Sequence, residues 1–316
     1  MRHPRFKLRG EAAFYHCYNR VSGHRSDRPF ERTEKEKFVR ILQLLRAFYC
    51  VDVVAYQVMS NHFHLILHVP DLPPSPEETC RRYKAFYPNR SPLEPGTPEC
   101  ERIARRMADL SVFMGDLQQR FSAWYNRTRP DRRRGSLWAD RFKNTLLDNG
   151  NALWACWAYV EMNPVRAGMV QDPAEYRFCS YGAWTATGRH PFEGTDGVDR
   201  AYASLAGLFL LKDMQSLRKA LRVAFVLKQA KDRHTPAKEV DAQVAEAQKP
   251  LPFHVELHRH SRYWVDGMVI GTELFVREAI TRVRGPSALK KRRLRRAVGD
   301  AAAELCCFKT LRSTHA

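Results

Sequence analysis

The chain has 316 residues, and its 44% hydrophobic content is enough for one large domain or two of ordinary size. Its 53 Lys and Arg residues outnumber 34 Asp and Glu, and the net charge of +19 favours a polyanionic partner such as nucleic acid, although such charge can also serve solubility alone. No run of about 18 uncharged apolar residues, no signal-peptide core and no CxxC pair among the eight cysteines are present, so we expect a cytoplasmic protein with reduced thiols and no membrane partner.

The first third of the chain predicts a strand, a helix and two further strands. Residues 11–22 are rich in aromatic and β-branched side chains, which is typical of a strand. Apolar residues recur at spacings of three and four within 31–50, which predicts an amphipathic helix. The segments 51–59 and 62–69 are separated by two residues only, so they are predicted to be antiparallel strands of a hairpin.

The next third is predicted to add two helices and one strand. Residues 70–98 are dense in proline, which favours an irregular insertion. The apolar rhythm of 100–126 predicts one long helix. After a basic turn, 141–148 is predicted to be a strand and 151–168 a helix that is ended by Asn163-Pro164.

This order, βαββαβ with a further helix, predicts an α+β fold of the ferredoxin-like kind, in which helices cover one face of an antiparallel sheet. The other face would stay free for a ligand. We predict this domain over 1–185, a helical segment and linker over 186–250, and a small basic C-terminal module over 251–316.

The stretch "NHFHLILH" at 61–68 places histidines at alternate positions. Strand alternation sends the apolar residues to the core and His62, His64, Ile66 and His68 to the open face. Two imidazoles at i and i+2 lie roughly 6 to 7 Å apart along a strand, close enough to share one divalent ion. The alternative is that they are ordinary polar residues on a solvated face.

Tyr159 and Asn163 stand four residues apart on the predicted helix and therefore share a face. A tyrosine hydroxyl has an ordinary pKa near 10, so as a nucleophile it needs an electrophile polarised by a metal or a nearby base. Asn163 could complete the coordination of such a metal. Alternatively, Tyr159 is a core residue and Asn163 a helix cap before Pro164.

These residues resemble a known family. The text "HFH" at 62–64, "GSLWADRFKNTLL" at 135–147 and "YVEMNPVRAGMV" at 159–170 are similar to the single-tyrosine HUH transposases, and most of all to the REP-associated tyrosine transposases, over residues 11–183. The resemblance implies that His62 and His64 bind Mg²⁺ or Mn²⁺ and that Tyr159 is the nucleophile. Insertion-sequence members have Gln four residues after their tyrosine, where this chain has Asn163.

The resemblance also implies metal-dependent cleavage and rejoining of single-stranded DNA at hairpin-associated sites through a 5′-phosphotyrosine, by a monomer or a homodimer. Basic and aromatic residues near the predicted site suit such a substrate, although a solvated loop is the alternative: Arg132, Arg133, Arg134, Trp138 and Arg141. A C-terminal run could clamp phosphates or form a solvated tail: Lys290, Lys291, Arg292 and Arg293.

Other functions fit the sequence less well. A catalytically silent hairpin DNA-binding protein would keep the fold and the charge, but the intact His62, His64 and Tyr159 argue against it. A metal hydrolase on a (β/α)₈ barrel needs eight strand and helix units, and the first 185 residues predict only four strands. An RNA-binding module should carry aromatics on its central strands, where histidines stand here.

Overall fold

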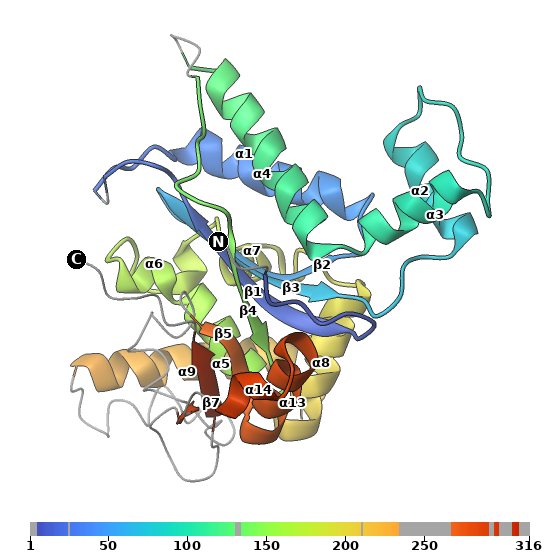
Figure 1. Ribbon diagram of the computed structural model, residues 1–316. Coiled ribbons are helices and arrows are strands. Elements are labelled where there is room, and N and C mark those ends of the chain that lie inside the picture. The colour runs from blue at the N-terminus through green and yellow to red at the C-terminus, as the bar shows by residue number, and fades with distance from the viewer. Residues whose placement is uncertain are drawn as a thin grey trace.

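The computed structural model describes residues 5–24, 26–129, 134–209, 211–233, 267–290, 294–296 and 305–309. Within them one sheet has the strand order β2-β3-β1-β4-β5-β7-β6 (Figure 1). Its strands are β1 (Ala13–Arg20), β2 (Asp52–Val58), β3 (His62–Val69), β4 (Lys143–Leu147), β5 (Gly267–Thr272), β6 (Arg295–Arg296) and β7 (Leu305–Lys309). Its helices are α1 (Arg32–Arg46), α2 (Pro76–Phe86), α3 (Pro98–Met107), α4 (Leu110–Arg127), α5 (Asn151–Glu161), α6 (Asn163–Arg166), the 3₁₀ helix η1 (Pro173–Glu175), α7 (Ser180–Thr187), α8 (Asp196–Phe209), α9 (Met214–Arg233), α13 (Glu273–Arg284) and α14 (Ser287–Lys290).

The first four strands confirm the predicted antiparallel sheet. β1 lies at its centre and pairs antiparallel with both β3 and β4, while β2 pairs antiparallel with β3. The β2–β3 hairpin is closed by a hydrogen bond from Met59 N to His62 O of 2.8 Å. In 62–69 the period-two alternation of apolar residues therefore predicted the strand and the faces that its side chains occupy.

The C-terminal segment extends this same sheet. β5 pairs in parallel with β4, Leu146 opposite Val269, and β7 pairs antiparallel with β5. The sheet is therefore continuous between the first 185 residues and the segment that was expected to form a module of its own. The last part of the predicted helical segment and linker, residues 234–250, lies outside the described residues, and the division into domains stays a prediction.

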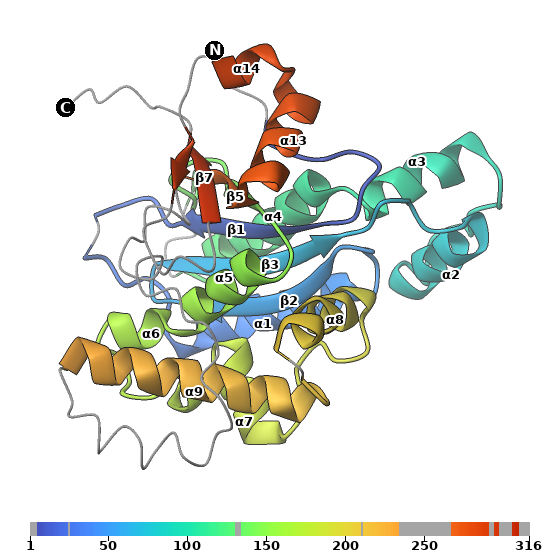
Figure 2. The same ribbon diagram turned by 90° about the horizontal axis from the view of Figure 1, so that it is seen from below.

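Both faces of the sheet are covered, so the prediction of helices on one face was wrong. On one face Phe38 of α1 packs against Phe63 of β3, with ring centres 4.8 Å apart. On the other face α5 and α8 pack, and a Cβ added to Gly197 of α8 would lie 2.7 Å from the Cβ of His68. Figure 2 shows α5 and α1 on opposite sides of the strands. The reason is that all residues of α5 from Ala152 to Glu161 are buried, which requires protein on every side.

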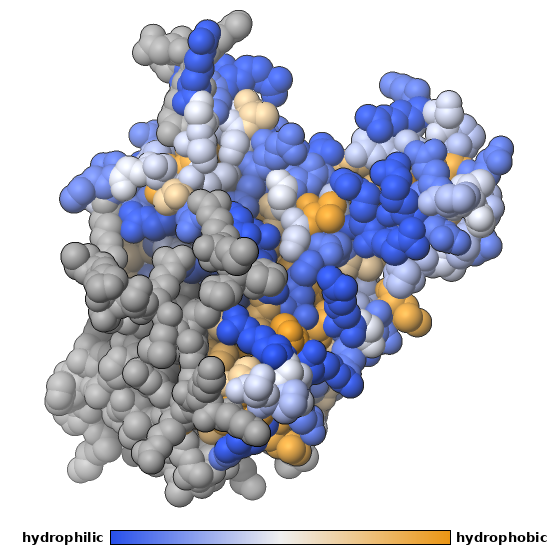
Figure 3. All heavy atoms as spheres, viewed as in Figure 1, coloured by the Kyte–Doolittle hydropathy of each residue, from blue (hydrophilic) through white to orange (hydrophobic). Residues whose placement is uncertain are grey.

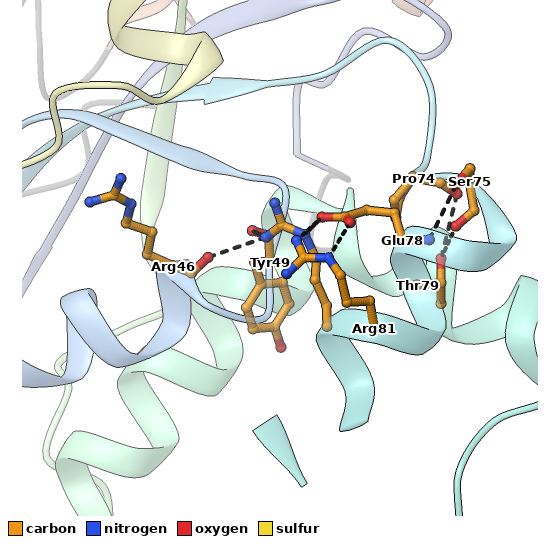
Figure 4. Close-up of polar contacts among 8 residues, drawn as sticks. Arg46, Tyr49, Pro74, Ser75, Glu78, Thr79 and Arg81 are labelled. Carbon is orange, nitrogen blue, oxygen red and sulfur yellow. Dashed lines mark hydrogen bonds and ion pairs between the residues drawn. The ribbon is translucent and has the colours of Figure 1, made fainter. Parts of the chain in front are cut away.

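A helical arm replaces part of the irregular insertion predicted over 70–98. Ser75 caps α2 by accepting a hydrogen bond from Glu78 N, and Pro76 fits the first turn because that turn needs no backbone donor. Arg82 then fastens α2 to the end of α1 by donating to the carbonyl oxygens of Arg46 and Tyr49, at 3.3 and 2.9 Å (Figure 4). Proline density therefore marked helix starts here as well as loops.

The helix predicted over 100–126 is two helices, α3 and α4, separated at Asp109. The Asp109 carboxylate accepts hydrogen bonds from the backbone N of Ser111 and Val112, at 2.6 and 3.0 Å, and so caps α4. It also forms an ion pair of 2.8 Å with Lys7. The apolar rhythm runs through both helices, which is why periodicity alone missed the break.

Replacing Asp109 with alanine is expected to lower the free energy of unfolding by about 1 to 2 kcal/mol, because two amide donors of α4 lose their cap. Asp109→Asn keeps an acceptor at the cap and gives up only the half-exposed ion pair with Lys7, so it should cost less. Urea denaturation followed by fluorescence measures both. Equal stability of the alanine and asparagine variants would contradict the cap.

Where Figure 3 colours the surface by hydropathy, it is mostly hydrophilic, with apolar residues in small separate patches. Across the residues whose structure is described, every helix is too short or too polar to span a lipid bilayer.

Candidate active site at His62, His64 and Tyr159

Strand pairing gathers polar and aromatic residues around the two histidines. His64 of β3 lies opposite Tyr18 of β1 and Gln57 of β2, and His62 lies opposite Arg20. The expected open face is not open, because His64 and His68 are each only 1% exposed under α5 and α8. His62 remains half-buried at the end of the strand. His62 is therefore the most exposed of these three histidines.

Helix α5 places Tyr159 directly over the histidines. The Tyr159 ring meets His64 edge-on with ring centres 5.5 Å apart, and it meets His16 of β1 in the same way at 6.0 Å. Tyr159 is 2% exposed, and this burial raises the pKa of its hydroxyl above the ordinary value. The Arg166 guanidinium acts in the opposite direction, with its Cζ 5.3 Å from the centre of the Tyr159 ring.

In both His62 and His64 the Nδ1 atom lies within hydrogen-bond distance of a partner. His62 Nδ1 lies 2.7 Å from the Asn61 side-chain oxygen, and His64 Nδ1 lies 2.9 Å from Nε2 of His16. Burial lowers the pKa of His62 to about 4 and that of His64 well below its ordinary value, so both rings are neutral at pH 7. A neutral imidazole whose Nδ1 carries the proton and donates it in a hydrogen bond keeps the lone pair of its Nε2 for a metal ion.

Asn163 caps α5, as the alternative interpretation held. Its Nδ2 donates to the carbonyl oxygens of Tyr159 and Val160, at 2.9 and 3.4 Å, which leaves Oδ1 as its atom for a ligand. Among the described residues no three His, Cys, Asp or Glu side chains are arranged to hold a metal. A divalent ion at this place would therefore rest on two imidazoles with amide, water or substrate oxygens, a mixed set that suits Mn²⁺ and admits Mg²⁺.

The residues predicted to contact DNA differ in where the structure places them. Trp138 is 9% exposed and packs on Phe63 while its indole N–H donates to Gln118 O, so the prediction that it stacks on bases is corrected. Arg134 and Arg141 are exposed in the loop before β4, which runs beside the end of β1 through a hydrogen bond from Ala139 N to Arg20 O. Their role in DNA binding stays a prediction. Five predicted contacts lie outside the described residues: Arg132, Arg133, Lys291, Arg292 and Arg293. Lys290 is the last residue of α14.

Several residues near the histidines were missed from the sequence. Arg20 and Arg28 add, after burial, to the lowering of the pKa of His62, and Arg166 adds to that of His64. The half-buried ring of Tyr18 lies 4.9 Å from that of His64 and 5.8 Å from that of His62. Tyr18 and Arg20 of β1 lie beside the histidines because of the register in which β1 pairs with β3. To predict them, this register would have had to be known, and the sequence around each residue does not give it.

Comparison with known proteins found likeness at the level of structure, and that likeness is distant. No family model matches the chain, and no curated protein matches it. A solved structure of a REP-associated tyrosine transposase bound to a REP hairpin is similar with a TM-score of 0.40 and 15% sequence identity, over 63% of this chain and 93% of that chain. At this distance no residue role is transferred from it.

Proposed function

We propose that this chain cleaves and rejoins single-stranded DNA at hairpin-associated sites, with Tyr159 as the nucleophile. The observation that carries the proposal is the position of the Tyr159 ring 5.5 Å from that of His64, on a helix and a strand far apart in the sequence. The strand order β2-β3-β1-β4 with its intervening helices is that of the ferredoxin-like arrangement, which we include in the proposal. The net charge of +19 supports a nucleic-acid substrate.

We further propose that His62 and His64 hold Mg²⁺ or Mn²⁺ through Nε2, with Asn163 as a third ligand through Oδ1. The engaged Nδ1 atoms and the neutral state of both rings support this assignment. When bound, such an ion would polarise the scissile phosphate and offset the negative charge that develops on its oxygens.

In the proposed reaction the Tyr159 hydroxyl loses its proton and its oxygen attacks the phosphorus. The bond from phosphorus to the 3′ oxygen breaks, and the 3′ oxygen takes up a proton and leaves as a 3′-OH. The downstream strand stays bonded to Tyr159 through its 5′ phosphate, as a 5′-phosphotyrosine. Attack by another 3′-OH reverses the step and rejoins DNA without ATP. Burial raises the pKa of the Tyr159 hydroxyl and so opposes its ionisation. The nearby Arg166 cation lowers this pKa and therefore favours loss of the proton.

Hairpin binding without cleavage is the second candidate. The 2% exposure of Tyr159 favours it, because a scissile phosphate must reach a hydroxyl that the folded chain covers. Cleavage then requires that substrate binding opens the site at the His62 end.

The test is to incubate the full chain with single-stranded hairpin oligonucleotides from the flanks of its gene, with Mn²⁺, Mg²⁺ or EDTA, and to run a denaturing gel. A covalent protein–DNA adduct that EDTA prevents supports the proposal. Hairpin binding without an adduct in either metal favours the binding protein, and absence of both would contradict both candidates.

Arg166→Ala is expected to slow adduct formation by about 100-fold, because one positive charge over the ring of the attacking tyrosine is lost. Arg166→Lys should recover part of the rate. The matched control is Arg105→Ala, which removes an exposed arginine from α3 on the helical arm. Single-turnover rates on one hairpin measure the effect, and equal rates for the Arg166 and Arg105 variants would refute it.

A further inference from the structure

A third histidine lies within the candidate site. His16 of β1 is 1% exposed, and its ring stacks on that of His64 with centres 5.1 Å apart and an angle of 10° between the planes. Its Nε2 lies 2.9 Å from Nδ1 of His64. The Tyr159 ring meets both imidazoles edge-on, so His16, His64 and Tyr159 form one buried group. No motif in the sequence pointed to His16.

The direction of the His16 contact excludes a role as a third metal ligand. The Nε2 atom of His16 is already committed to His64, and within the described part of the chain no three such side chains converge on a metal position. Only one proton lies between the two nitrogens of this contact. If His64 Nδ1 carries it, the lone pair of His64 Nε2 is free for a cation; if His16 Nε2 carries it, His64 Nε2 is protonated and cannot bind one.

His62 shows the same arrangement with a partner whose role is unambiguous. Its Nδ1 lies 2.7 Å from the Asn61 side-chain oxygen, which can only accept, so the proton is on Nδ1. Asn61 is itself fixed by donating to the carbonyl oxygen of Asp27 at 2.8 Å. His62 and His64 therefore each have a partner that orients the ring from the Nδ1 side.

We propose that His16 is a positioning residue that accepts a hydrogen bond from His64 Nδ1 and thereby keeps His64 Nε2 available to a divalent cation. The inference rests on the metal site of the proposed function. His16 itself does not touch the cation. Metal-binding histidines commonly depend on such a partner, and its loss costs about 10 to 100-fold in metal affinity.

The first test reads the tautomer directly and needs no metal. The full chain labelled with ¹⁵N-histidine is studied by long-range proton–nitrogen NMR, with the His64 signals assigned from their loss in His64→Ala. The expected result is an Nδ1-protonated ring in the wild-type chain and in His16→Gln, whose side-chain oxygen can accept the same bond. In His16→Leu the Nδ1 preference should be lost. A His64 ring protonated on Nε2 in the wild-type chain would overturn the inference.

The second test measures affinity for Mn²⁺ alone, from the electron paramagnetic resonance signal of the free ion. His16→Leu is expected to bind 10 to 100-fold more weakly than the wild-type chain, and His16→Gln within about threefold of it. His68→Leu is the matched control, because His68 of β3 lies on the same face of the sheet as His16, is equally buried and contacts Phe14 rather than the site. Wild-type affinity in His16→Leu, or equal losses in His16→Leu and His68→Leu, would overturn the inference.

Failure of the proposed function gives a different pattern. If the wild-type chain binds Mn²⁺ at His64 and the His16 variants behave as expected, but no DNA adduct forms, the cleavage proposal fails and the positioning role stands. If an adduct forms in Mn²⁺ and His16→Leu binds the ion normally, only the positioning role fails. If His64→Ala binds Mn²⁺ as the wild-type chain does, the metal site and the role of His16 fail together.

Discussion

Tyr159→Phe is expected to abolish the covalent protein–DNA adduct, by at least about a thousandfold in rate, while the affinity for the hairpin stays within a few-fold of wild type. The substitution removes one oxygen from a side chain that is 2% exposed and leaves its ring against His64 and His16. The fold and the basic surface are therefore retained and only the attacking atom is lost. Denaturing gels measure the adduct and fluorescence anisotropy measures binding.

Tyr18 is the comparison that makes this result decisive. It is the other tyrosine whose ring lies within 6 Å of a candidate metal ligand, with its centre 4.9 Å from that of His64, and it is more exposed than Tyr159. If Tyr18→Phe forms the adduct and Tyr159→Phe does not, the nucleophile is Tyr159. An adduct that persists in Tyr159→Phe and disappears in Tyr18→Phe would instead assign the attack to Tyr18 and refute our mechanism.

The strand over 62–69 was predictable because its apolar residues alternate. The helices that cover both faces of the sheet were not predictable in this way. Alternation in 62–69 assigned Phe63 and His64 to opposite faces, as the structure has them. The second face of the sheet is covered because α5 and α8 pack on it, and those contacts join segments far apart in the chain. Trp138 shows the same limit, since an aromatic residue beside a basic turn fits a stacking platform as well as a core position.

The site was predictable in part for a related reason. Two short motifs contain the predicted site residues at fixed spacings: His62 and His64 in one, Tyr159 and Asn163 in the other. Each motif could therefore be found from local sequence alone. His16 and Arg20 come beside the histidines only through the pairing of β1 with β3, and a shift of one residue in that register would turn them to the other face. Local sequence does not specify this register, and the structure was needed to find them.

Glu161 lies between Tyr159 and Asn163 in the same motif and holds the opposite side of α5. It is fully buried, and its carboxylate accepts hydrogen bonds from Ser180 Oγ, from Trp157 Nε1 at 3.2 Å and from Tyr181 N at 3.1 Å. These contacts tie α5 to the start of α7. The rotation of α5 that points Tyr159 at His64 therefore depends on this carboxylate.

Glu161→Ala is expected to lower the free energy of unfolding at pH 7 by about 3 kcal/mol, because three buried donors lose their acceptor and each costs about 1 kcal/mol or more. Urea denaturation followed by circular dichroism measures the change. Glu278→Ala is the matched control, since it removes an exposed carboxylate from α13 and should change stability by less than about 0.5 kcal/mol. Equal stability of the two variants would mean that Glu161 does not hold α5.

The pH dependence of stability gives Glu161 a second signature. Burial raises its pKa from the ordinary 4.5 to about 7, so between these values the folded chain keeps a proton that the unfolded chain has lost. The contribution of Glu161 to stability therefore falls as the pH rises through this window, by about 3 kcal/mol in total. Buried histidines act in the opposite direction, since burial lowers the pKa of His68 and His190 to about 4 and 3, and their contribution is lost as the pH falls below 6.5.

The two effects separate when each variant is compared with the wild-type chain at every pH. Glu161→Gln cannot ionise, so the stability difference between it and the wild-type chain should change by about 3 kcal/mol between pH 4.5 and 7, with the wild-type chain relatively more stable at the acid end. The histidine contributions cancel in this difference because both chains contain them. A difference that stays constant across the window would show that Glu161 ionises at its ordinary pKa. The carboxyl group between α5 and α7 would then be ionised, not protonated, in the folded chain over this pH range.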